Sequence, residues 1–173
     1  MLDWLRDGII LYAFPALMVY AAMTDLIDRR IANWVSLALV GGFVVLAVVT
    51  LMPPLQVATH VGVALIAFTI GFTMFALGVM GGGDVKLIAA SILWFGPQAA
   101  LPYAFAFSLA GMVVTLVFVV LRLDRFQYLL AMNPVTRPFA GRDPSGRDVP
   151  YGMAISAGAL FVVPLLATVH GMI

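Results

Sequence analysis

The sequence predicts an all-α, polytopic integral membrane protein with six transmembrane helices. Its 173 residues are 64% hydrophobic and only 10% charged, and the mean hydropathy is +1.11. A soluble domain is nearer half apolar and a quarter charged, so this chain has little room for a soluble domain. Its apolar residues also fall into runs that approach the roughly 20 residues needed to cross a bilayer. We therefore expect residues 1–173 to form a single membrane-embedded domain.

The composition excludes several classes of function. Cysteine is absent, which rules out disulfides, thiolate metal sites and cysteine nucleophiles. The two histidines, His60 and His170, are too far apart to suggest a metal centre, and we expect neither a metal nor a cofactor. The net charge of +1 and the lack of a basic run give no sign of a nucleic-acid partner.

Six apolar runs are expected to form the helices, and Pro or Gly-Pro turns separate several of them. The first run follows Asp3, Arg6 and Asp7 instead of a basic segment, so we expect a retained anchor and not a cleaved signal peptide. Pro15 is a potential kink within it. The expected helices cover residues 8–24, 34–52, 58–79, 84–95, 99–121 and 151–169.

Residues 84–95 determine the predicted topology. This segment reaches only about 18 Å as a helix, against a hydrocarbon core of about 30 Å, so it could cross the membrane or turn back within it. If the segment crosses the membrane, every Lys and Arg except Arg6 lies on the cytoplasmic side. If it turns back, the five arginines from Arg122 onward move outside. Since cytoplasmic loops are enriched in Lys and Arg, the first arrangement is favoured, with both termini outside.

The longest polar stretch, residues 122–150, is then a cytoplasmic loop. Its proline and glycine content is typical of a loop, and its five arginines are suited to anionic lipid headgroups. Contact with a substrate or partner is the alternative interpretation.

Gly81-Gly82-Gly83-Asp84 places a carboxylate at the start of an apolar segment. Ionisable groups at membrane depth are costly and commonly functional. Glycines would let the backbone adopt angles closed to other residues and approach another chain, as a protease must approach its substrate. A tight turn capped by Asp at a helix start is the simpler interpretation.

Asp25 closes the first apolar run, and the predicted topology places it on the same membrane face as Asp84. Asp25 alone is compatible with a helix-end pair to Arg29, and Asp28 is an equal candidate from the residues alone. Two close carboxylates can share one proton and activate a water against a peptide bond, as in aspartyl proteases. A proton- or cation-coupled transporter is the alternative, because small transporters place charged sites beside broken helices near the midplane. A non-catalytic scaffold is the third possibility.

Four flanking residues have ordinary structural interpretations. Lys86 points away from Asp84 on a helix and is expected to extend to the headgroups. Asn33 is expected to be the N-cap of the second helix. Pro150 suits a helix start, and Tyr151 suits the membrane interface.

Taken together, the chain resembles the type IV prepilin peptidases, in particular the short forms of tight-adherence and Flp pilus systems. The resemblance implies that Asp25, and not Asp28, is the first catalytic aspartate and that Asp84 is the second. One departure is Ala32, which stands where the family usually has proline. The residues that carry the resemblance, and that it implies support the site or bind substrate, are Asn33, Gly81, Gly82, Gly83, Lys86, Pro150, Tyr151 and Gly152.

The resemblance also implies a reaction and a location. A multi-pass enzyme of the bacterial cytoplasmic (inner) membrane would remove the short basic leader of prepilins at the cytoplasmic face. Larger members also methylate the new N-terminus and carry a cysteine-bearing insertion. This chain has no cysteine and no room for the insertion, so we expect leader removal without methylation. The expected partners are the prepilin, membrane lipids and the pilus assembly machinery.

Overall fold

The computed structural model describes residues 3–121, 132 and 149–169, and in this part of the chain all regular structure is helical. The all-α prediction is therefore confirmed. The predicted loop 122–150 lies almost wholly outside the described residues. The elements are α1 (Asp3–Gly8), a π-helical turn η1 (Ile9–Ala13), α2 (Phe14–Asp28), α3 (Asn33–Val49), α4 (Pro54–Ala76), α5 (Gly82–Leu121) and α7 (Tyr151–Val169).

Three helical stretches are long and apolar enough to cross a membrane, namely Trp4–Asp28, Pro54–Ala76 and Gly82–Leu121. Asn33–Val49 and Tyr151–Pro164 are shorter apolar helices. Large apolar side chains point outward from several of them, including Leu37 (70% exposed) and Phe105 (73%). Apolar exposure on this scale is costly in water and suits a lipid environment, so the chain is a membrane protein. Six crossings remain a prediction.

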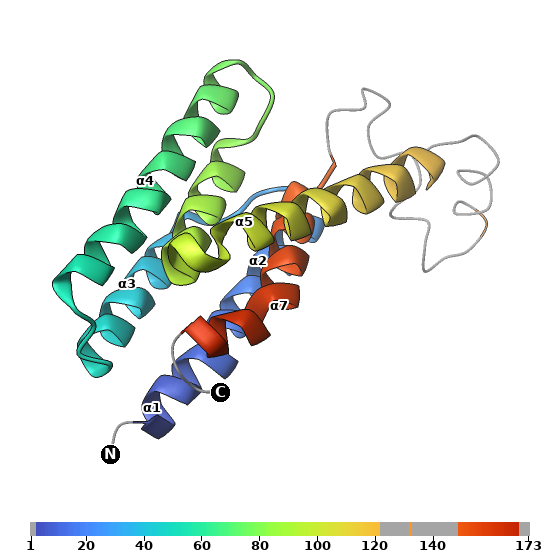
Figure 1. Cartoon of the computed structure of the whole chain (residues 1–173). Coiled ribbons are helices and arrows are strands. Elements are labelled where there is room, and N and C mark those ends of the chain that lie inside the picture. Colours follow the sequence, from blue (N-terminus) through green and yellow to red (C-terminus); the bar gives the residue numbers. More distant parts are fainter. Residues whose placement is uncertain (1–2, 122–131, 133–148, 170–173) are drawn as a thin grey trace.

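The long helix α5 is broken at Gly96, which has φ 60° and ψ −170°, and it changes direction there (Figure 1). Pro97 follows and has no N–H, so it cannot donate to the Leu93 carbonyl as a helical residue would. His60 from α4 replaces that donor, because its Nδ1 lies 2.8 Å from Leu93 O and a carbonyl can only accept. The break is thus closed by a buried side chain from the neighbouring helix.

Neighbouring segments run antiparallel. Gly71 of α4 lies against Val85, near the start of α5, whereas His60 lies against Gly96. The second half of α5 then returns along α7, because Gly158 packs on Phe107 and Gly111 faces Ala154. Consecutive segments therefore alternate in direction, and α1 lies at the same end of the bundle as the last turn of α7 (Figure 1).

Aromatic side chains fill the centre of the bundle. Phe14 lies 4.9 Å from Trp94 between ring centroids, and Phe95 lies 4.6 Å from Tyr103. All four are fully buried. Trp94 Nε1 donates to the Leu39 carbonyl at 2.9 Å, which ties α5 to α3 and satisfies the indole N–H inside the core.

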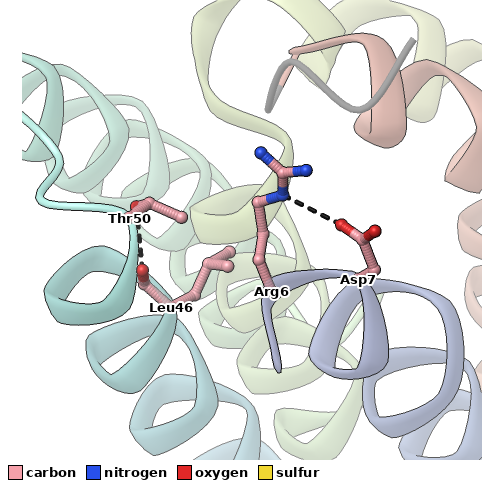
Figure 2. Close-up of polar contacts among 4 residues, drawn as sticks. All are labelled: Arg6, Asp7, Leu46 and Thr50. Carbon is pink, nitrogen blue, oxygen red and sulfur yellow. Dashed lines mark hydrogen bonds and ion pairs between the residues drawn. The ribbon is translucent and has the colours of Figure 1, made fainter. Parts of the chain in front are cut away.

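The end of the bundle that holds α1 carries short-range polar contacts. Arg6 Nε lies 2.9 Å from Asp7 Oδ1, and Thr50 Oγ1 donates to the Leu46 carbonyl at the end of α3, as Figure 2 shows. Further along this first stretch, the π-helical turn η1 ends just before Pro15. The predicted irregularity at Pro15 therefore coincides with a local change in helix type, since proline removes one backbone donor.

Candidate active site

Asp25 lies at the end of the bundle opposite α1. This residue lies near the end of α2 and is only 7% exposed. Its Oδ2 accepts a hydrogen bond from the Gly152 N–H at 2.7 Å, and the Met153 amide lies beside the same carboxylate. The first turn of α7 thus holds Asp25 through backbone donors, as helix N-termini hold anions generally. Asp28, the other candidate in this segment, is exposed.

Asp84 is the third residue of α5 and lies close enough to Asp25 for the two carboxylates to interact electrostatically. The Gly81 amide hydrogen-bonds back to the Asp84 carboxylate, while the Gly81 carbonyl accepts from the Val85 N–H at 3.2 Å. This exchange resembles a capping box, with glycine at the N-cap and the acid at N3. Each aspartate is therefore oriented by a glycine amide at a helix start.

The three consecutive glycines are needed for close packing within the chain. A Cβ at Gly81 would lie 2.9 Å from Asp84 Oδ2, one at Gly82 would lie 3.3 Å from Phe75, and one at Gly83 would lie 3.2 Å from Ile31. None of the three has a positive φ, because the positive-φ glycines among the described residues are Gly78 and Gly96. The expectation of backbone angles reserved for glycine was wrong at this motif.

Lys86 and Asn33 contact each other on another side of α5. Lys86 Nζ donates to Asn33 Oδ1 at 2.9 Å, and both residues are exposed. The prediction that Asn33 caps α3 was wrong, because the N-cap is Ala32 and Asn33 is the first helical residue. The Asn33 amide oxygen instead joins α3 to α5.

Pro150 and Tyr151 place the start of α7. Pro150 is buried, its carbonyl accepts from the Met153 N–H at 3.2 Å, and Tyr151 is the exposed first residue of the helix. Gly152 must be small, since a Cβ there would lie 2.8 Å from Asp25 Oδ2. The sequence predicted a helix start in this segment, but it did not predict that the Gly152 amide donates to Asp25.

Arg29 ends α2 in the left-handed conformation, with φ 54°. Its charge acts on Asp25, as the spacing of four residues predicts, and its guanidinium lies 5.3 Å from the centre of the Phe118 ring. The contact with Phe118 was not anticipated, because nothing in the sequence links residues so far apart.

The fold and the site define a helical membrane protein that brings two acidic side chains together at one end of its bundle. The family model described as the type IV leader peptidase family matches residues 12–119, and the chain belongs to this family. The match contains both aspartates and ends before α7. Membership implies a peptidase with a prepilin as its substrate. No curated protein and no solved structure was found to match.

Proposed function

We propose that the chain is an aspartyl endopeptidase that removes the leader peptide from type IV or Flp prepilins, with Asp25 and Asp84 as its catalytic pair. The observation that carries the proposal is the placement of buried Asp25, held by the Gly152 amide, within electrostatic range of Asp84. Both acids come from helix ends far apart in sequence. A purely structural acid at a helix end would not require a second carboxylate beside it.

In the proposed reaction the two carboxylates share one proton. The ionised partner takes a proton from water, and the resulting hydroxide attacks the carbonyl carbon of the scissile peptide bond. The protonated partner hydrogen-bonds to the carbonyl oxygen and later donates its proton to the leaving amine as the carbon–nitrogen bond breaks. The glycine amides hold both acids in place throughout, and the chemistry requires only water as co-reactant.

The position of the acids also favours proteolysis over coupled transport. Asp25 lies in the last turn of α2 and Asp84 in the first turn of α5. A coupling site for ions is expected near the middle of the membrane, where access can alternate between the two sides. Carboxylates at helix ends are better placed to meet a peptide at the membrane surface.

We place the site at the cytoplasmic face of a bacterial inner membrane, in a chain with six crossings and both termini outside. The alternating directions of the helices and the distribution of Lys and Arg support this arrangement. The absence of cysteine supports leader removal without methylation of the product. The basic leader would then stay in the cytoplasm while the apolar segment of the prepilin remains in the membrane.

The test is a cleavage assay with the purified chain and a prepilin-like substrate. Asp25→Asn and Asp84→Asn should each lower the rate at least about a thousandfold, since each removes one partner of the acid–base pair. Asp28→Asn is the matched control and should cleave at the wild-type rate. Leader removal by Asp84→Asn at a rate near wild type would disprove the proposal, as would failure of the wild type to cleave any prepilin.

A further inference from the structure

A groove of about 480 Å³ runs between α3, α4 and α5, apart from the two aspartates. Each helix contributes residues spaced three or four apart, so one face of each helix lines it. Its polar residues, Asn33, Ser36 and Lys86, lie near the starts of α3 and α5. The apolar lining residues are Leu37, Val40, Val61, Ala64, Leu65, Phe68, Ala89, Ala90 and Leu93.

The polar end of the groove has hydrogen-bonding capacity to spare. The Lys86 ammonium has three donors, and the bond to Asn33 Oδ1 at 2.9 Å uses one of them. Ser36 is 8% exposed, and its Oγ has no hydrogen-bond partner among the described residues.

The remainder of the groove is apolar and open to the side of the bundle. Leu65 and Leu37 on its walls are 60% and 70% exposed, and Phe68 is 40% exposed. Ala64 and Ala89 are small and leave space between the helices. In a membrane these walls face acyl chains. The groove thus has a cation at its polar end, and apolar side chains line the remainder, which we call the apolar channel.

We infer that this groove is a binding site for an anionic phospholipid. The phosphate pairs with the exposed Lys86 ammonium at the polar end of the groove. One acyl chain fills the apolar channel. The charge of Lys86 selects an anionic over a zwitterionic headgroup, as basic pockets between transmembrane helices do.

The prepilin's apolar helix is the rival occupant, and the geometry disfavours it. Lys86 is two residues beyond Asp84, about 200° around the helix at 100° per residue. The Asp84 carboxylate interacts electrostatically with Asp25 of α2, whereas Lys86 contacts Asn33 of α3. The body of α5 therefore separates the groove from a peptide bond held at the carboxylates. The lipid site does not depend on peptidase activity.

The test is native mass spectrometry of the purified full-length chain, titrated with dioleoyl phosphatidylglycerol or dioleoyl phosphatidylcholine. The wild type should bind phosphatidylglycerol the more tightly. Lys86→Gln should weaken that binding about fivefold, the effect of one basic side chain at a membrane surface. Lys86→Arg should retain the preference, and Ala89→Leu should weaken both lipids by filling the channel. Arg30→Gln, which removes an exposed charge from the α2–α3 connection, should change nothing.

Equal affinity of the wild type for the two lipids would overturn the inference, and that comparison requires no variant to fold. An equal loss of phosphatidylglycerol affinity in Arg30→Gln and Lys86→Gln would also overturn the inference, because equal losses would show a general attraction of the lipid to basic side chains. A third contrary result would come from a synthetic apolar helical peptide. If that peptide bound the wild type, displaced phosphatidylglycerol and failed to bind Ala89→Leu, the inference would be overturned. The groove would then be a helix-docking site.

Discussion

At the scale of single residues, Asp25 depends on a backbone amide that only glycine can bring close enough. A Cβ at Gly152 would lie 2.8 Å from Asp25 Oδ2 and 2.9 Å from its Cγ, inside any normal contact distance. Gly152→Ala should therefore displace the carboxylate and lower the cleavage rate by about a hundredfold, the usual cost of a 1 Å misplacement. Gly62→Ala is the matched control, because nothing lies within 4 Å of a Cβ there. Equal rates for the two variants would show that the Gly152 contact does not orient Asp25.

At Ala32 we predict a substitution that stabilises the protein. It stands where the resembling family usually has proline, and its φ of −67° is the value that a proline ring imposes. Ala32→Pro should therefore raise the free energy of unfolding by about 0.4–1 kcal/mol, because it restricts the unfolded chain more than the folded one. The measurement is thermal unfolding of both proteins in one detergent. A lower melting temperature for the proline variant would contradict the prediction.

The sequence singled out the two aspartates as candidates, but it could not predict the groups that hold them. The cost of a charge at membrane depth singled out acids beside apolar runs, and the resemblance separated Asp25 from Asp28. The Gly152 amide lies 127 residues from Asp25, and no local pattern predicts which helix start will meet which carboxylate. At Asn33 the local N-cap preference gave the wrong prediction, and its amide oxygen instead accepts from the Lys86 ammonium on another helix.

At the scale of helices, the break in α5 depends on both a backbone conformation and a neighbouring side chain. Gly96 has φ 60°, and a Cβ there would lie 2.5 Å from the His60 ring. Gly78 also has a positive φ, of 71°, but nothing lies within 4 Å of a Cβ there. Gly78→Ala should therefore cost about 1 kcal/mol of stability for the left-handed conformation alone. Gly96→Ala should cost at least about 1 kcal/mol more, because it also overpacks the core.

Reversible unfolding of these two variants in mixed micelles measures the difference. Equal losses of stability would show that the His60 ring moves aside freely.

The sequence predicted the end of one helix near Gly96-Pro97, because glycine and proline interrupt helices wherever they occur together. It did not predict His60 as the replacement donor for Leu93 O, because that role requires α4 and α5 to be already packed side by side.

At the scale of the whole molecule, two independent observations point to the same arrangement of the chain. Counting Lys and Arg places the starts of the segments at 84 and 151 on one side of the membrane. Packing places the same two starts beside Asp25, through the Gly152 hydrogen bond and the proximity of Asp84. The charge count uses only the sequence, whereas the packing observation uses only contacts in the fold.

The lack of cysteine makes this arrangement directly testable, because single cysteines can be introduced without a background. We expect Leu51→Cys and Gln98→Cys, both at exposed positions, to react with a membrane-impermeant maleimide in intact spheroplasts. Asp28→Cys and Tyr151→Cys, also at exposed positions, should react only after the membrane is opened. If residues 84–95 turned back within the bilayer, Gln98 would be protected and Tyr151 labelled, whereas Leu51 and Asp28 would be unchanged. Such an exchange would place the start of α7 outside the cell and away from the cytoplasmic end of α2. Gly152 could not then reach Asp25, so this labelling pattern would remove the six-crossing topology and the proposed site together.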